Sequence, residues 1–183
     1  MTSGATDAPL AWNVAGLLGD DIGADRVLEV DGAAIELGED LALAEPIVGQ
    51  VRLVRTNRGI LATADMHAAL ALECSRCLRA IVHPVEIRLQ EEYLPALDLT
   101  TGRPLPIDDE PDVERLTDHH ELDLEPVVRD AILLAEPIAS LCEPDCAGLC
   151  IVCGMRLDEG THDHPEDDID PRMEALRGFR AED

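Results

Sequence analysis

Six cysteines in two clusters are the residues of this chain whose type and spacing could do chemistry. The first cluster is a CxxC pair, and the second is a CxxxCxxxCxxCG run; together they comprise Cys74, Cys77, Cys142, Cys146, Cys150 and Cys153. Thiolate sulfurs two residues apart can bind one tetrahedral Zn²⁺ ion at about 2.3 Å. In a reducing compartment, clustered cysteines are metal ligands more often than disulfides. The sequence therefore predicts a bound Zn²⁺ ion with a structural role.

A tetrahedral ion takes four thiolates, so the six cysteines leave three arrangements open. The first CxxC pair could join the closing CxxC pair in a zinc ribbon, which has the most regular spacing. The second cluster could close a site by itself, with the smallest loop-closure entropy. In the third arrangement the first pair joins Cys142 and Cys146. The prediction is that four of the six bind metal, without a choice among these sets.

Other kinds of chemistry have weaker signals. The first CxxC ends an expected strand, so it lacks the helix N-terminus that activates redox cysteines. The histidines at 119–120, 162 and 164 lie in acidic loops. They could hold metal transiently, but we expect solvated side chains. No glycine-rich phosphate loop, nucleophile elbow or Ser/His/Asp pattern occurs. We therefore expect no enzyme and no small-molecule substrate.

The charge of the chain bears on its partners. A net charge of −25 arises from 39 acidic residues against 14 basic ones, all of them arginine. Nucleic acids bind basic surfaces, so direct RNA contact is disfavoured and a basic protein is the better partner. One local basic concentration could still contact RNA phosphates; it comprises Arg52, Arg55, Arg58, Arg76 and Arg79.

The sequence shows no pattern typical of a membrane span or of a secretory signal. No run of about 18 apolar residues predicts a membrane span, and residues 1–18 lack the basic start of a secretory signal. The expected location is the cytoplasm.

Apolar periodicity predicts the elements that must position the cysteines. Alternating side chains favour strands at 60–73 and 85–93, preceded by a strand at 47–56. The first CxxC then lies at the turn between two long strands. Asp31-Gly32 suggests a further hairpin within 26–37. The remaining expectations are a turn at 57–59 with residues suited to positive φ, a short helical turn at 12–18 capped by Asn13, and one amphipathic helix at 122–136 capped by Asp123.

These elements predict an α+β fold: an antiparallel β-sheet, partly barrel-like, with one packed helix and a Cys-rich, zinc-binding segment at 142–153. Residues 1–157 form the expected domain, with a flexible acidic insertion at 95–121. Residues 158–183 are expected to be an acidic, largely disordered tail with a short helix at 171–180.

Motifs spread along the chain resemble a known family. The segments are WNVAGLL at 12–18, RLVRTNRGIL at 52–61, LECSRCL at 72–78, LCEPDCAGLCIVCG at 141–154 and DPRMEAL at 170–176. They are similar, in order, to the YceD (DUF177) family of large ribosomal RNA subunit accumulation proteins. The resemblance implies a non-enzymatic role in accumulation of 23S ribosomal RNA and in ribosome assembly. Some members lack the last two cysteines, which favours the third arrangement.

The resemblance and the charge together give a leading hypothesis. The chain is expected to bind a basic ribosomal protein or a pre-ribosomal large subunit, because in many bacteria the family's gene neighbours that of a small basic zinc-ribbon ribosomal protein. The alternative is a zinc-handling or zinc-dependent regulatory protein. Chelation separates the two, because a structural ion contributes folding free energy and a sensor ion does not.

Overall fold

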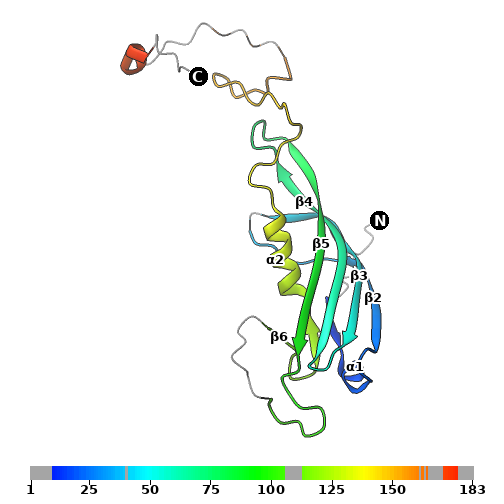
Figure 1. The fold of residues 1–183 in the computed structure, drawn as a ribbon. Coiled ribbons are helices and arrows are strands. Elements are labelled where there is room, and N and C mark those ends of the chain that lie inside the picture. The colour runs from blue at the N-terminus through cyan, green and yellow to red at the C-terminus, as the bar shows by residue number, and fades with distance from the viewer. Residues whose placement is uncertain are drawn as a thin grey trace, which may run out of the picture.

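The computed structural model describes residues 10–39, 41–105, 113–160, 162, 164 and 171–176. The described residues form a five-stranded sheet of order β2-β3-β4-β5-β6 and a two-stranded sheet of β1 and β7 (Figure 1). The elements are β1 (Ala11–Asn13), α1 (Ala15–Gly19), β2 (Asp25–Ala33), β3 (Ala42–Arg55), β4 (Ile60–Glu73), β5 (Ala80–Leu94), β6 (Glu114–Arg115), β7 (Glu121–Asp123), α2 (Glu125–Ala135) and the 3₁₀-helix η1 (Pro171–Leu176).

Three long antiparallel strands form the centre of the sheet. Strand β4 has the bounds that the alternating pattern predicts. Strand β3 begins five residues before the predicted 47–56 and ends one residue short of it, and β5 extends beyond the predicted 85–93 at both ends. Strands β4 and β5 pair without a break from Ile60↔Tyr93 to Glu73↔Ala80. Because the pairing of β4 with β5 continues to the last residue of β4, the next residue, Cys74, lies in the turn at the end of the sheet.

The expected hairpin at Asp31-Gly32 is wrong. Strand β2 continues through both residues and pairs with β3 on either side of them. The register shifts between Asp31 and Ala33, and Gly32 has a φ of 92°. Asp-Gly thus accommodates a β-bulge, because glycine takes the positive φ that a bulge requires.

The turn between β3 and β4 lies where the sequence predicts it, but for a different reason. Neither Asn57 nor Gly59 has a positive φ. A Cβ atom at Gly59 would collide with the backbone carbonyl of Tyr93 on β5. The Gly59 N–H donates to the Thr56 hydroxyl at 2.9 Å, and Arg55 donates to the Gly59 carbonyl at 3.0 Å. Glycine is needed here for close approach of the backbone.

The hydrophobic core lies on one face of the sheet, covered by the helices. Helix α2 lies alongside β5 (Figure 1) and buries Val128 and Ile132 completely. Helix α1 buries Leu17 and Leu18. Alanines at alternate positions contribute much of the β4 face, in keeping with a thin aliphatic core; they are Ala62, Ala64 and Ala68.

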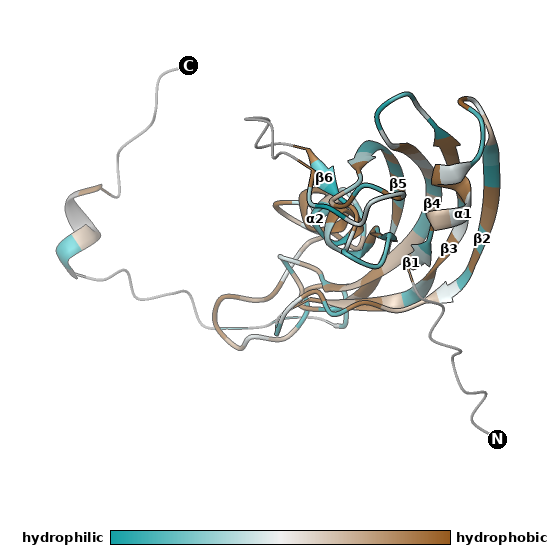
Figure 2. Ribbon diagram, turned by 90° about the horizontal axis from the view of Figure 1, so that it is seen from below, coloured by the Kyte–Doolittle hydropathy of each residue, from teal (hydrophilic) through white to brown (hydrophobic). Residues whose placement is uncertain are grey.

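The partly barrel-like expectation is wrong, although the α+β class and the antiparallel pairing of β2 to β5 are confirmed. Strands β2 and β6 are the edges of the sheet and do not pair with each other, and the two residues of β6 run parallel to β5. Figure 2, viewed along the strands, shows a curved, open sheet. A barrel requires paired edges, whereas here α2 packs against β5 and covers the apolar face.

The two predicted helix caps, Asp123 and Asn13, are each one residue too early: the N-cap positions are Leu124 and Val14, and neither makes a side-chain cap hydrogen bond. The predicted side chains still accept hydrogen bonds close to the helix starts. The Asp123 carboxylate accepts from the Glu125 N–H at 2.9 Å at the start of α2, which ends before Pro137. The Asn13 side chain accepts from the Ala15 N–H at 3.1 Å at the start of α1. These carboxylate and amide groups satisfy N–H groups that a helix cannot pair internally.

The segments expected to be irregular contain some regular structure. The range 95–121 includes β6, the first residue of β7 and an isolated bridge between Leu97 and Pro104. In the tail, η1 covers the start of the predicted helix; residues 177–180 lie outside the described part of the chain. Within the described ranges, no helix has the length and apolar character to cross a membrane.

Candidate metal centre

The first CxxC forms a tight knuckle at the turn between β4 and β5. The Cys74 N–H donates to the Arg79 carbonyl at 2.8 Å, and the Leu78 N–H donates to the Cys74 carbonyl at 2.9 Å. Leu78 closes the turn with a φ of 56°, a left-handed conformation that is unusual for leucine. This backbone directs the sulfurs of Cys74 and Cys77 away from the strands and towards the chain that follows α2.

The segment after α2 brings the second cluster back to the knuckle. Pro137 ends the helix, and the chain runs along the end of the sheet (Figure 1). The Ser75 N–H donates to the Ser140 carbonyl at 2.8 Å, and the Arg76 guanidinium donates to the Cys146 carbonyl at 3.0 Å. These two bonds hold Cys142 and Cys146 beside the knuckle.

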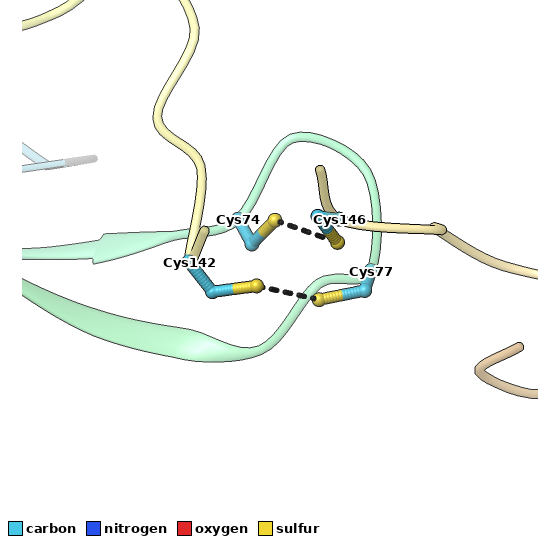
Figure 3. Close-up of side chains that lie close together, drawn as sticks. All are labelled: Cys74, Cys77, Cys142 and Cys146. Atoms are coloured by element: carbon cyan, nitrogen blue, oxygen red, sulfur yellow. Dashed lines mark hydrogen bonds between the residues drawn. The ribbon is translucent and has the colours of Figure 1, made fainter. Parts of the chain in front are cut away.

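Four sulfurs from these two segments form one cluster, which comprises Cys74, Cys77, Cys142 and Cys146 (Figure 3). All four lie within 4.8 Å of one another. The Cys74–Cys146 and Cys77–Cys142 sulfur–sulfur distances are 3.8 and 3.7 Å. A tetrahedron with metal–sulfur bonds of about 2.3 Å has edges of about 3.8 Å. The thiol geometry therefore fits a Zn²⁺ ion held by these four residues.

Burial and hydrogen bonding affect the four thiols unequally. The backbone N–H of Cys142, helped by those of Cys77 and Arg76, lowers the pKa of Cys74 to about 6 against the opposing effect of burial. Burial raises the pKa of Cys142 to about 12, and it also raises the pKa of Cys146. Cys74 therefore ionises more readily than an ordinary cysteine. If all four cysteines were thiolates, their mutual repulsion would require a bound cation to offset it.

A site of this kind is closed. Cys74, Cys77 and Cys146 are buried, and Leu141 and Leu149 pack against them. None of the six cysteines forms a disulfide. Four protein ligands leave no coordination position for a substrate, which is typical of structural rather than catalytic zinc. The cluster can fasten the segment after α2 to the end of the sheet.

The structure thus assembles the third of the three arrangements that the sequence leaves open. The closing pair, Cys150 and Cys153, does not join the first knuckle; it lies with His162 and His164. Ligand atoms of those four residues also lie within 4.8 Å of one another. The expectation that these histidines are simply solvated missed this grouping. The sequence signal that could have predicted this grouping is the HxH motif of His162 and His164, which lies shortly after the closing CxxC.

The five arginines of the local basic cluster make hydrogen bonds and ion pairs within the protein. Arg55 donates to the carbonyls of Leu18 and Gly59, both at 3.0 Å. The remaining contacts are those of Arg52 with Asp25 at 3.0 Å, Arg58 with Glu92 at 4.0 Å, Arg76 with the Cys146 carbonyl at 3.0 Å and Arg79 with Asp158 at 2.7 Å. These arginines therefore stabilise the sheet and the knuckle, rather than forming an unpaired basic patch.

The fold and the site define a class of protein: an open β-sheet domain with one packed helix and cysteine clusters that could hold metal. The family model for "Large ribosomal RNA subunit accumulation protein YceD" matches residues 62–180, which include all six cysteines. The chain belongs to the YceD family.

The chain is similar to curated proteins from mycobacteria. It is 35% identical over 130 residues to the uncharacterized protein Rv2926c of Mycobacterium tuberculosis, covering 69% of this chain and 58% of that protein. It is 31% identical over 155 residues to the uncharacterized protein ML1660 of Mycobacterium leprae, covering 80% of this chain and 66% of that protein. The chain therefore spans less than two thirds of the length of these relatives. No solved structure matches it significantly.

Proposed function

We propose that this chain is a non-enzymatic cytoplasmic factor for accumulation of 23S ribosomal RNA and for assembly of the large ribosomal subunit. The observation that carries the proposal is the YceD family match over residues 62–180. The closed four-thiol cluster supports it, because such a site stabilises a binding scaffold and offers no position for a substrate.

The direct partner in this proposal is a basic ribosomal protein, free or on a pre-ribosomal particle. The net charge of −25 favours association with a basic surface and repels bare RNA. The arginines near the first knuckle do not offset this, because they make contacts within the protein.

One open groove beside α2 has the chemistry that such a partner needs. It has a volume of about 510 Å³ and is lined by Leu89, Glu91, Glu114, Val127, Asp130, Ala131 and Leu134. Its apolar side chains suit the aliphatic stem of a lysine or arginine, while the carboxylates suit the charged head. We take this groove as the contact surface to test.

The test measures partner capture and ribosomal RNA together. A tagged chain is used for pull-downs at physiological salt, and 23S ribosomal RNA is quantified in a strain whose only copy carries the triple change Glu91→Gln, Glu114→Gln and Asp130→Asn. We expect the wild type to capture a large-subunit protein or particle, and the triple variant to lose that capture and lower 23S levels. A control with equal charge loss elsewhere carries Asp21→Asn, Glu45→Gln and Asp118→Asn, all at exposed positions.

Three results would overturn parts of this proposal. If the wild type captures no ribosomal component and deletion leaves 23S levels unchanged, the function itself is wrong. If both triple variants lose capture equally, overall charge rather than the groove determines binding. If the groove variant keeps capture, the groove is not the contact surface.

A zinc-dependent regulator remains the second candidate, because the second cluster includes the exposed Cys153. A regulator would exchange its ion reversibly while the sheet stays folded. Partner capture that switches on and off with free Zn²⁺ at constant fold would favour this candidate.

A further inference from the structure

The side chains of Cys150, Cys153, His162 and His164 gather outside the four-thiol cluster, with ligand atoms within 4.8 Å of one another. We propose that they form a second, separate metal site, which takes a Zn²⁺-type cation through two thiolates and two imidazoles. The chain would then hold two metal ions, one in each cluster. Two cysteines and two histidines make a common tetrahedral zinc set.

The backbone around the closing CxxC repeats the backbone of the first knuckle. The Cys150 N–H donates to the Met155 carbonyl at 2.7 Å, and the Gly154 N–H donates to the Cys150 carbonyl at 2.8 Å. These bonds occupy the same relative positions as those from Cys74 and Leu78 in the first knuckle. Gly154 has a φ of 70°, in the same left-handed region as Leu78. Because the two turns share one backbone geometry, we infer that they share one role, which is to present a pair of sulfurs to a metal ion.

The ring of His162 is oriented as a metal ligand. Its Nε2 atom lies 3.0 Å from the Arg156 carbonyl oxygen, and its Nδ1 atom lies 3.5 Å from the Cys153 sulfur. A carbonyl can only accept a hydrogen bond, so Nε2 carries the proton. In the neutral ring, Nδ1 then presents its lone pair to the cluster. Metal-bound histidines usually make this kind of outer hydrogen bond to a carbonyl.

His164 supplies the fourth ligand. Its Nε2 atom is buried and has no hydrogen-bond partner among the described residues. A buried polar nitrogen without a partner is costly, and a cation in the cluster would supply that partner. The rings of His162 and His164 have centroids 5.9 Å apart, so both can face the same ion.

Arg156 links this site to the first. Its Nε atom donates to the Cys77 carbonyl at 3.0 Å, while its own carbonyl is the oxygen beside His162. One residue therefore touches the backbone of the first knuckle and orients a ligand of the second. The second ion would tie His162 and His164 to the first knuckle.

The test is metal content by elemental analysis of the full chain purified with Zn²⁺. We expect two ions per wild-type chain and one in the double variant His162→Gln/His164→Gln. The matched control His67→Gln, at an exposed position on β4, should keep two. Because the double variant leaves every cysteine and the sheet core unchanged, circular dichroism should show wild-type secondary structure.

Cobalt substitution identifies the ligands independently. The wild type should show overlapping absorption from a four-sulfur site and a mixed sulfur–nitrogen site, and the double variant should show only the four-sulfur spectrum. One ion per wild-type chain, or two ions in the folded double variant, would overturn the proposal. A ribbon that joins the two CxxC pairs would also contradict it, and would appear as a single ion lost on either Cys74→Ser or Cys153→Ser.

Discussion

The two knuckles have the same backbone geometry and opposite surroundings. The first lies at the end of two long paired strands and receives its other two cysteines from a segment about 65 residues further along the chain. The second takes both histidines from within fifteen residues, and its Cys153 is exposed, whereas Cys74 is completely buried. The turn alone therefore prepares a pair of sulfurs, while the surrounding fold decides whether an ion there acts as a clasp or as an accessible peripheral site.

Replacing one cysteine in each knuckle should give the largest difference between them. Cys77→Ser removes a ligand that joins the sheet to the segment after α2, so we expect loss of one ion and a fall in Tm of about 10 °C or more. Cys153→Ser should also lose one ion, with a fall in Tm of only about 2 °C, because its ligands are local. Differential scanning calorimetry with metal analysis measures both. Equal falls in Tm would show that the first cluster is not the structural clasp.

The link through Arg156 should matter more to the second site than to the first. Arg156→Met removes the hydrogen bond to the Cys77 carbonyl and frees the second knuckle to move, so we expect about 10-fold weaker binding of one ion. The other ion should stay bound. Competition with a chromophoric chelator gives both affinities. The control is Arg88→Met, an exposed arginine on β5 paired with Glu86; an equal effect of the two changes would rule out a specific link.

The residue that follows each CxxC, Leu78 in the first knuckle and Gly154 in the second, has a left-handed backbone conformation. Exchanging the residue type at each position should have a smaller effect on metal binding, in opposite directions. A side chain in this conformation costs roughly 1–2 kcal/mol, so Gly154→Ala should weaken the second site by about 5- to 30-fold. Leu78→Gly relieves the same strain in the first knuckle, and we expect no metal loss. The chelator competition applies here too. Weaker binding at the first site in Leu78→Gly would mean that Leu78 contributes packing that outweighs its strain.

The ion pair between Arg79 and Asp158 should have the smallest effect. The 2.7 Å contact joins the first knuckle to the second, but both side chains are more than 40% exposed. Arg79→Gln should change Tm by at most about 2 °C, and the difference should vanish at high salt because exposed charges are screened. Thermal unfolding at two salt concentrations tests this. A larger shift that persists in salt would make the pair part of the clasp.

Local patterning determined much of the fold in advance. The alternation at 60–73 predicts β4 to the residue, and Pro126, Pro137 and the apolar stripe between them place α2 closely. Side-chain periodicity carries this information because each strand or helix buries one face. Asp31-Gly32 misled, since a hairpin turn and a bulge both require glycine at positive φ, and only the pairing of β2 with β3 on both sides distinguishes them.

The sequence by itself determined that thiols able to bind metal exist, that they come in CxxC pairs, and that the chain is strongly acidic. The tertiary structure decided which pairs meet. Which cysteines come together depends on the position at which α2 ends and on the hydrogen bond from the Ser75 N–H to the Ser140 carbonyl. The grouping of the second cluster depends on the Arg156 carbonyl that orients His162. Such contacts join residues that are distant in sequence, or depend on backbone atoms common to every residue type, so spacing alone carries no record of them.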